Sequence, residues 1–222
     1  MTLIESTAAH VRAEMIGEGS GHDWWHVYRV WQTAKRLAAA EIASGAEVDT
    51  EVVELAALLH DLGDHKFHGG DTSVAPRMTR DWLTDLHADA ELIEQVAEIV
   101  ATLSFKGANV ATPMTTLEGQ IVQDADRLDA IGAIGVARAF AYGGHKGREL
   151  YNPDIPPQLH DDFDQYASST APTINHFYEK LLLLKDRLNT TSAKQVAEGR
   201  HRFLSQFLDQ FFVEWNGDDV PR

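Results

Sequence analysis

The sequence contains no cysteine and few basic side chains. Its 222 residues include 19 lysines and arginines against 34 acidic residues, which gives a formal net charge of -15. Without thiols the chain cannot form a disulfide, a thiolate nucleophile, a cysteine zinc site or an iron–sulfur cluster. The acidic excess repels phosphate backbones, so we expect no non-specific binding to nucleic acid.

Long apolar runs are also missing. The N-terminal stretch MTLIESTAAHVRAEM has acidic and polar residues where a secretory signal needs an apolar run, and no run in the chain approaches membrane-spanning length. We therefore expect a cytoplasmic protein with no membrane partner. The length predicts a single domain over residues 1–222, and the sequence leaves a homo-oligomer open.

Strand patterns are nearly absent, because apolar residues recur at helical spacing almost everywhere. This predicts an all-α helical bundle with its core at about residues 20–142. The expected helices span residues 3–16, 22–43, 50–61, 73–86, 89–102, 117–142, 173–188 and 192–215. The last helix is expected to start at the capping-box pattern Ser192-Ala-Lys-Gln195. Periodicity is lost over residues 143–171, where three prolines predict a long loop that is either functional or disordered.

Four side chains from separate predicted helices form a candidate metal site: His26, the pair His60-Asp61, and Asp126. Helical proteins build metal sites from inward-facing ligands of this kind. Two imidazoles and two carboxylates without a thiolate suit a six-coordinate divalent ion that keeps open positions. We expect Mn²⁺ first, with Mg²⁺, Ni²⁺ or Fe²⁺ as alternatives, rather than a closed structural zinc site.

The motifs around these residues supply a wider context. They are Gly21-His-Asp-Trp-Trp-His26, Ala57-Leu-Leu-His-Asp61, Ser104-Phe-Lys-Gly107, Gln123-Asp-Ala-Asp-Arg-Leu-Asp-Ala-Ile-Gly-Ala-Ile-Gly135 and His176-Phe-Tyr-Glu-Lys180. Over most of its length the chain thus resembles the HD-domain superfamily of metal-dependent phosphohydrolases, in particular its stand-alone bacterial members. The resemblance implies an all-α fold, a His-His-Asp-Asp metal site and nucleotide pyrophosphohydrolase activity.

Carried onto this sequence, the resemblance places the metal ligands at His26, His60, Asp61 and Asp126. Two other acids, Asp124 and Asp129, compete with Asp126, and Asp129 lies on nearly the same helix face. The setting Ala125-Asp-Arg-Leu128 favours Asp126. One turn before His26, His22 is the alternative first ligand.

The resemblance also implies a general acid or base at Asp64, four residues after His60. The next residue, His65, stands where some relatives have a second acid and is a candidate proton carrier. An acidic protein must neutralise substrate phosphates with a few well-placed cations. The candidates are Lys106, Arg127, Arg29, Lys146 and Arg148, the last two in a loop that would close over a bound triphosphate.

These features predict a metal-dependent phosphohydrolase that acts on a small phosphorylated substrate, first of all an NTP or dNTP with release of pyrophosphate. Residue chemistry alone reaches only metal-assisted hydrolysis of an anion, and the resemblance supplies the substrate class. One alternative is a phosphomonoesterase, phosphodiesterase or alarmone hydrolase on the same site. Others are a di-iron oxygenase, with further ligands from Asp64, His65 or His68, and a nucleotide sensor without turnover.

Overall fold

The computed structural model describes residues 1–16, 21, 23–63, 71–105, 107–160, 165 and 168–221. Within these residues all the regular elements are helices, which confirms the predicted all-α class. In chain order they are α1 (Leu3–Glu14), α2 (Trp24–Ala43), α3 (Thr50–Leu59), α4 (Val74–Asp85), α5 (Ala90–Thr102), α6 (Leu117–Asp129), α7 (Gly132–His145), α9 (Thr173–Glu179), the 3₁₀ helix η2 (Leu181–Arg187) and α10 (Thr191–Asn216).

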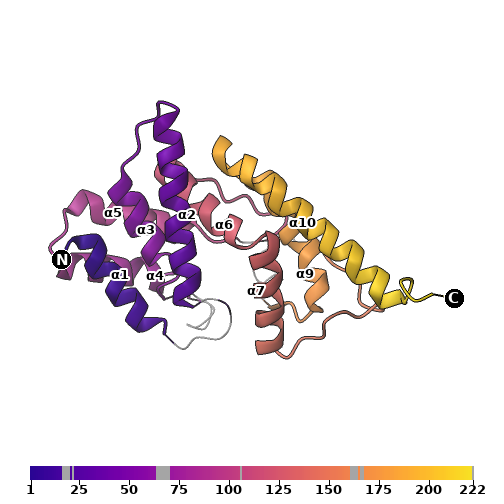
Figure 1. The fold of residues 1–222 in the computed structure, drawn as a ribbon. Coiled ribbons are helices and arrows are strands. Elements are labelled where there is room, and N and C mark those ends of the chain that lie inside the picture. The colour runs from indigo at the N-terminus through magenta and orange to yellow at the C-terminus, as the bar shows by residue number, and fades with distance from the viewer. Residues whose placement is uncertain are drawn as a thin grey trace.

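The helices form two groups that meet at α6 (Figure 1). Helices α1 to α5 lie at the N-terminal end of the molecule, and α7, α9 and α10 lie at the C-terminal end. Helix α2 packs against both α3 and α6, while α10 packs against α6 and α7. The core runs through these contacts, where Val27, Leu58 and Ile121 are fully buried. Helices α2, α3 and α6 therefore meet along their buried faces.

Side-chain caps fix where these three helices start. The Asp23 carboxylate accepts a hydrogen bond from the His26 amide at the start of α2. Asp49 caps α3 in the same way, and the Thr116 hydroxyl accepts from the Gly119 amide at the start of α6. Each cap satisfies an amide that lacks a helical partner. The caps therefore set which residues of each helix face the core.

The predicted helix over residues 117–142 is wrong in one respect, because the chain breaks between α6 and α7. Ile131 is extended, and Gly132 has a φ of 76°, which an L residue rarely adopts. A Cβ at Gly132 would lie 3.1 Å from the Arg200 side chain of α10. The glycine thus allows both the turn and the close approach of α10.

Two further expectations for the C-terminal region are corrected. The helix predicted over residues 173–188 is α-helical only to Glu179, and η2 follows after Lys180, whose φ of -143° interrupts the α-helix. The cap of α10 is Thr190 rather than Ser192: the Thr190 hydroxyl accepts from the Ala193 amide. Ser192 instead donates a hydrogen bond to Glu41 on α2.

The long loop begins after α7, a few residues later than predicted. Arg148 donates to the Ser169 carbonyl, and the Asn109 amide donates to the carbonyl of His160, so protein contacts hold both parts of the loop. A cavity of about 300 Å³ lies against this segment and reaches Glu179 of α9. In the described part of the chain, no helix is both long enough and apolar enough to span a bilayer.

Candidate metal centre

The four predicted ligands come together where α2, α3 and α6 meet. The Nε2 atom of His26 lies 3.2 Å from Nε2 of His60, 3.2 Å from an Asp61 oxygen and 3.5 Å from an Asp126 oxygen. His60 Nε2 is 3.6 Å from Asp61 and 3.9 Å from Asp126. Both histidine side chains are 1% exposed, whereas that of Asp126 is 30% exposed. Solvent therefore reaches the cluster at Asp126 and not at the imidazoles.

Each imidazole presents a lone pair to the cluster. His60 Nδ1 lies 2.8 Å from the Ala57 carbonyl oxygen, which can only accept, so Nδ1 carries the proton. His26 Nδ1 lies 2.7 Å from a carboxylate oxygen of Asp129 and donates in the same way. In the neutral form of each ring, Nε2 therefore carries the lone pair and faces the cluster. Two lone pairs and two carboxylates that face one another repel unless a cation lies between them.

The spacing and electrostatics of the donor set fit a divalent ion. Zinc-like ions hold nitrogen and oxygen ligands at about 2.0–2.2 Å, which places neighbouring ligand atoms about 3.0–3.5 Å apart. The distances around His26 Nε2 lie in this range or close to it. Burial lowers the pKa of His26, but hydrogen bonds to Asp129 and Asp61 raise it above its ordinary value. Burial likewise raises the pKa of Asp126, yet the neighbouring imidazoles bring it below its ordinary value. The cluster thus favours positive charge.

Comparisons with known proteins agree with this geometry. The HD domain family model matches residues 24–131, which include all four clustered side chains. YpgQ of Bacillus subtilis is 39% identical over 218 residues, which cover 97% of this chain and 95% of YpgQ. The chain belongs to the HD-domain family. It is accordingly an HD-superfamily enzyme, a metal-dependent phosphohydrolase.

Solved structures of HD-domain relatives share the whole fold. A protein of Lactobacillus plantarum superposes with a TM-score of 0.86 at 35% identity and covers 98% of this chain and 99% of its own. An HD-superfamily hydrolase of Bacillus thuringiensis has a TM-score of 0.71 at 43% identity, over 96% of both chains. The crystal structure of B. subtilis YpgQ in complex with ADP has a TM-score of 0.71 at 33% identity, over 98% of both chains.

Asp129 lies beside the cluster, in contact with the His26 ring on the side away from the other three residues. Its two carboxylate oxygens contact His26, Arg29 and Arg138. Burial raises the pKa of Asp129, but the hydrogen bonds from His26 and Arg29 and the charge of Arg138 bring it well below its usual range. Sequence reasoning weighed Asp129 as a ligand and overlooked Arg138. A general rule could have indicated this role for Asp129: a histidine that binds a metal through one ring nitrogen needs a hydrogen-bond acceptor for the other.

Asp124, the remaining aspartate of α6, lies on a different face of the helix. Its carboxylate accepts four hydrogen bonds from Asn189 and Thr190, two of them from backbone amides. The side chain is fully buried and ties α6 to the start of α10. Of the three acids weighed for the last ligand position, the fold brings Asp126 to the two imidazoles.

The predicted phosphate-binding cations lie in different surroundings. Arg127 is buried and donates to the Arg187 carbonyl and to the Thr112 hydroxyl; burial lowers its pKa to about 10. The side chains of Lys146 and Arg148 pack over the Tyr142 ring. Arg29 is bound to Asp129 and keeps 33% of its side chain exposed. The remaining predicted residues, Lys106, Asp64, His65, His68 and His22, lie outside the described residues.

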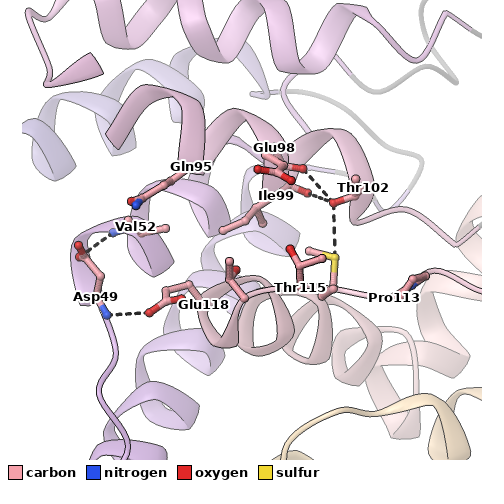
Figure 2. Close-up of a pocket in the computed structure, with 11 residues that line it drawn as sticks. Asp49, Val52, Gln95, Glu98, Ile99, Thr102, Pro113, Thr115 and Glu118 are labelled. Atoms are coloured by element: carbon pink, nitrogen blue, oxygen red, sulfur yellow. Dashed lines mark hydrogen bonds between the residues drawn. The ribbon is translucent and has the colours of Figure 1, made fainter. Parts of the chain in front are cut away.

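A pocket of about 180 Å³ lies at the N-terminal ends of α3 and α6, away from the cluster (Figure 2). Asp49 stands at its edge before α3, and Glu118 lies in the first turn of α6. With a rise of about 1.5 Å per residue, Asp49 lies about 16 Å from His60 along α3. The pocket is thus separate from the metal cluster. Two of its carboxylates take part in hydrogen bonds at the helix start: Glu118 accepts from the Asp49 amide, and Asp49 accepts from the Val52 amide.

Proposed function

We propose that this protein hydrolyses the phosphoanhydride bond of a nucleoside triphosphate, an NTP or dNTP, with release of pyrophosphate. The observation that carries the proposal is the group of His26, His60 and Asp126, with Asp61 in contact with both imidazoles, which opens toward solvent at Asp126. The nucleotide class is supported by YpgQ, which is similar over nearly its whole length and binds ADP in its crystal structure.

The ion would be held by His26, His60, Asp61 and Asp126. When bound, a divalent ion lowers the pKa of a water molecule and polarises a phosphoryl oxygen, which supplies a nucleophile without a protein side chain. Oxygen-rich ligands without thiolates favour Mn²⁺, with Mg²⁺, Ni²⁺ or Fe²⁺ as alternatives. The protein contributes two imidazoles whose protons are held away from the cluster by Ala57 and Asp129.

With a divalent ion bound, the charge at the cluster would suit an anionic substrate despite the net charge of the chain, because the ion and two arginines would outweigh Asp61, Asp126 and Asp129. Asp129 carries one negative charge, and it lies between the guanidinium groups of Arg29 and Arg138, so the three residues together carry a net positive charge. Arg29 is exposed enough to reach a phosphate with the part of its guanidinium that Asp129 does not bind. We propose that Lys106 and the loop cations Lys146 and Arg148 provide further positive charge.

Proton transfer is assigned to the segment that follows α3. Asp64 comes four residues after His60, and we propose it as the general acid or base that serves the attacking water or the leaving group. His65 follows it and is proposed as a second proton carrier. Asp64→Asn should therefore lower kcat while metal binding is retained.

The test is a metal-by-substrate assay of the protein stripped with chelator. Each of the four metals is restored separately, and NTPs, dNTPs, nucleoside monophosphates and cyclic dinucleotides are offered in turn. We expect pyrophosphate from a triphosphate, abolished in Asp61→Asn and retained in Asp124→Asn, which changes a buried acid outside the cluster. Orthophosphate from a monophosphate, or a ring-opened monophosphate, would replace the proposal with a phosphomonoesterase or a phosphodiesterase. Bound metal with no turnover of any substrate would refute hydrolysis of a nucleotide.

A further inference from the structure

We propose that Asp129 is a positioning residue for the metal centre: held by Arg29 and Arg138, it fixes the His26 ring with Nε2 toward the ligand cluster. The inference rests on the metal-binding part of the proposed function and is independent of the substrate. The hydrogen bonds that hold Asp129 go to His26, Arg29 and Arg138. None of these bonds involves His60, Asp61 or Asp126.

The carboxylate of Asp129 is held at both oxygens. Oδ1 accepts from Arg29 Nε at 2.7 Å, and Oδ2 accepts from Arg29 Nη2 at 3.0 Å and from Arg138 Nη1 at 3.1 Å. Oδ2 also accepts the Nδ1 proton of His26 at 2.7 Å. A bidentate arginine on one side and a second arginine on the other prevent the carboxylate from rotating. The acceptor for His26 therefore has one position.

His26 is held at its backbone as well as at its ring. Asp23 accepts the His26 amide at 2.9 Å as the cap of α2, so the helix starts in a fixed register. Arg138 contacts both Asp129 and the segment before α2, because its Nε donates to the Gly21 carbonyl at 2.8 Å while its Nη1 donates to Asp129. Arg138 lies on α7, which leads into the long loop. The position of α7 is thus coupled to the orientation of a metal ligand.

A carboxylate between two arginines can also be an ion pair that serves stability alone. Asp124 provides the comparison, since it is a buried acid of the same helix with a complete set of hydrogen bonds and no contact with a ligand in those bonds. If Asp129 serves stability alone, replacing either acid with asparagine lowers stability and leaves the metal affinity unchanged. If Asp129 positions His26, the two substitutions differ in metal affinity.

The experiment measures Mn²⁺ binding to the full-length protein by titration calorimetry, for wild type, Asp129→Asn and Asp124→Asn. Circular dichroism shows at which temperature each variant is folded. Loss of an outer residue that orients a metal ligand weakens metal affinity by about 10–100-fold. We expect a loss of this size in Asp129→Asn and less than about 3-fold in Asp124→Asn, with a smaller loss in Arg138→Gln than in Asp129→Asn. Excess Mn²⁺ should restore much of the kcat of Asp129→Asn.

Wild-type Mn²⁺ affinity in a folded Asp129→Asn protein would overturn the proposal. If Asp129→Asn does not fold, the Mn²⁺ affinity of Arg138→Gln is the test, because that variant keeps the contacts between Arg29 and Asp129. An unchanged Mn²⁺ affinity in Arg138→Gln would equally refute a positioning role for Asp129. Wild-type protein that binds Mn²⁺ but hydrolyses no nucleotide refutes the proposed function and leaves this inference standing. Wild-type protein that binds none of the four divalent ions would overturn the inference.

Discussion

Replacing Asp124 with asparagine separates two roles that acids of α6 can have. The Asp124 carboxylate is fully buried and joins α6 to the segment before α10. One oxygen accepts from the amide and the side chain of Asn189, and the other accepts from the amide and the hydroxyl of Thr190. The Thr190 hydroxyl in turn caps α10. The substitution keeps the shape of the side chain and removes one acceptor oxygen.

The loss in the free energy of unfolding of Asp124→Asn follows from the number of hydrogen-bond donors that lose their acceptor. Two of the four hydrogen bonds are lost, each worth about 1.5–3 kcal/mol because the acceptor is charged. Burial raises the pKa of Asp124, so a neutral side chain recovers part of this cost. A net loss of about 3 kcal/mol in the free energy of unfolding remains. For a chain of this size, 1 kcal/mol corresponds to about 2–4 °C, so Tm should fall by about 6–12 °C.

Thermal unfolding followed by circular dichroism measures the loss, and Mn²⁺ titration below the transition tests the site. The metal affinity should stay within about 3-fold of wild type, because the ligands lie on another part of α6. Asp126→Asn is the matched control and should show the opposite: a small change in Tm and a lost or strongly weakened metal site. If Asp124→Asn loses metal with an unchanged Tm, the assignment of the last ligand to Asp126 is refuted.

Three further results are expected. Mn²⁺ at about 100 times its Kd should raise stability by about 2.7 kcal/mol and increase Tm; Asp61→Asn should abolish the shift, and an equal shift in that variant would contradict the assigned ligands. Gly132→Ala should destabilise by about 1–3 kcal/mol because its φ is 76°, whereas Gly199→Ala on the open face of α10 should stabilise by about 0.5–1 kcal/mol in urea unfolding. Arg127→Gln should lower Tm with KM for nucleotide nearly unchanged, since its guanidinium bonds to protein groups; a large rise in KM would instead place it at the substrate.

The helices that could be predicted are those that local signals define. Asp49 and Asp89 each precede an apolar pattern, and each caps the helix that follows. These signals act over one turn, so they depend little on the remaining chain where one strong cap is present. The predicted starts of α3 and α5 therefore agree with the structure to within one residue.

Distant contacts decide what local signals could not predict. Ala130 and Ile131 are compatible with a helix, but Arg200 of α10 lies against Gly132 and donates to the Leu128 carbonyl at the end of α6. Thr190 and Ser192 are both good caps, and the buried carboxylate of Asp124 settles the choice by holding Thr190. In both places a partner more than 60 positions away in the sequence selects one of two acceptable conformations.

The metal site likewise combines features that the local sequence predicts with features that distant contacts decide. The residue types and their order were readable, because a ligand must be a histidine or a carboxylate and the motifs marked four of them. The sequence could not predict the hydrogen bond that holds the His26 ring. Its partner Asp129 lies 103 positions away, and a sequence does not show which acid reaches which ring. Arg29 illustrates the consequence: its position one turn after His26 predicts a phosphate-binding cation, and the sequence does not show that its guanidinium also holds Asp129.

The spacing of the three aspartates on α6 explains how one helix contributes both to the candidate metal site and to the packing of the fold. At about 100° per residue, Asp126 and Asp129 lie about 60° apart around the helix axis, whereas Asp124 lies about 160° from Asp126. The first two therefore face α2, one beside the ring of His26 at Nε2 and the other at Nδ1. The third faces α10 and Thr190. Because opposite faces of a rigid helix make these contacts, stability and metal binding can be changed separately by substitutions only two residues apart.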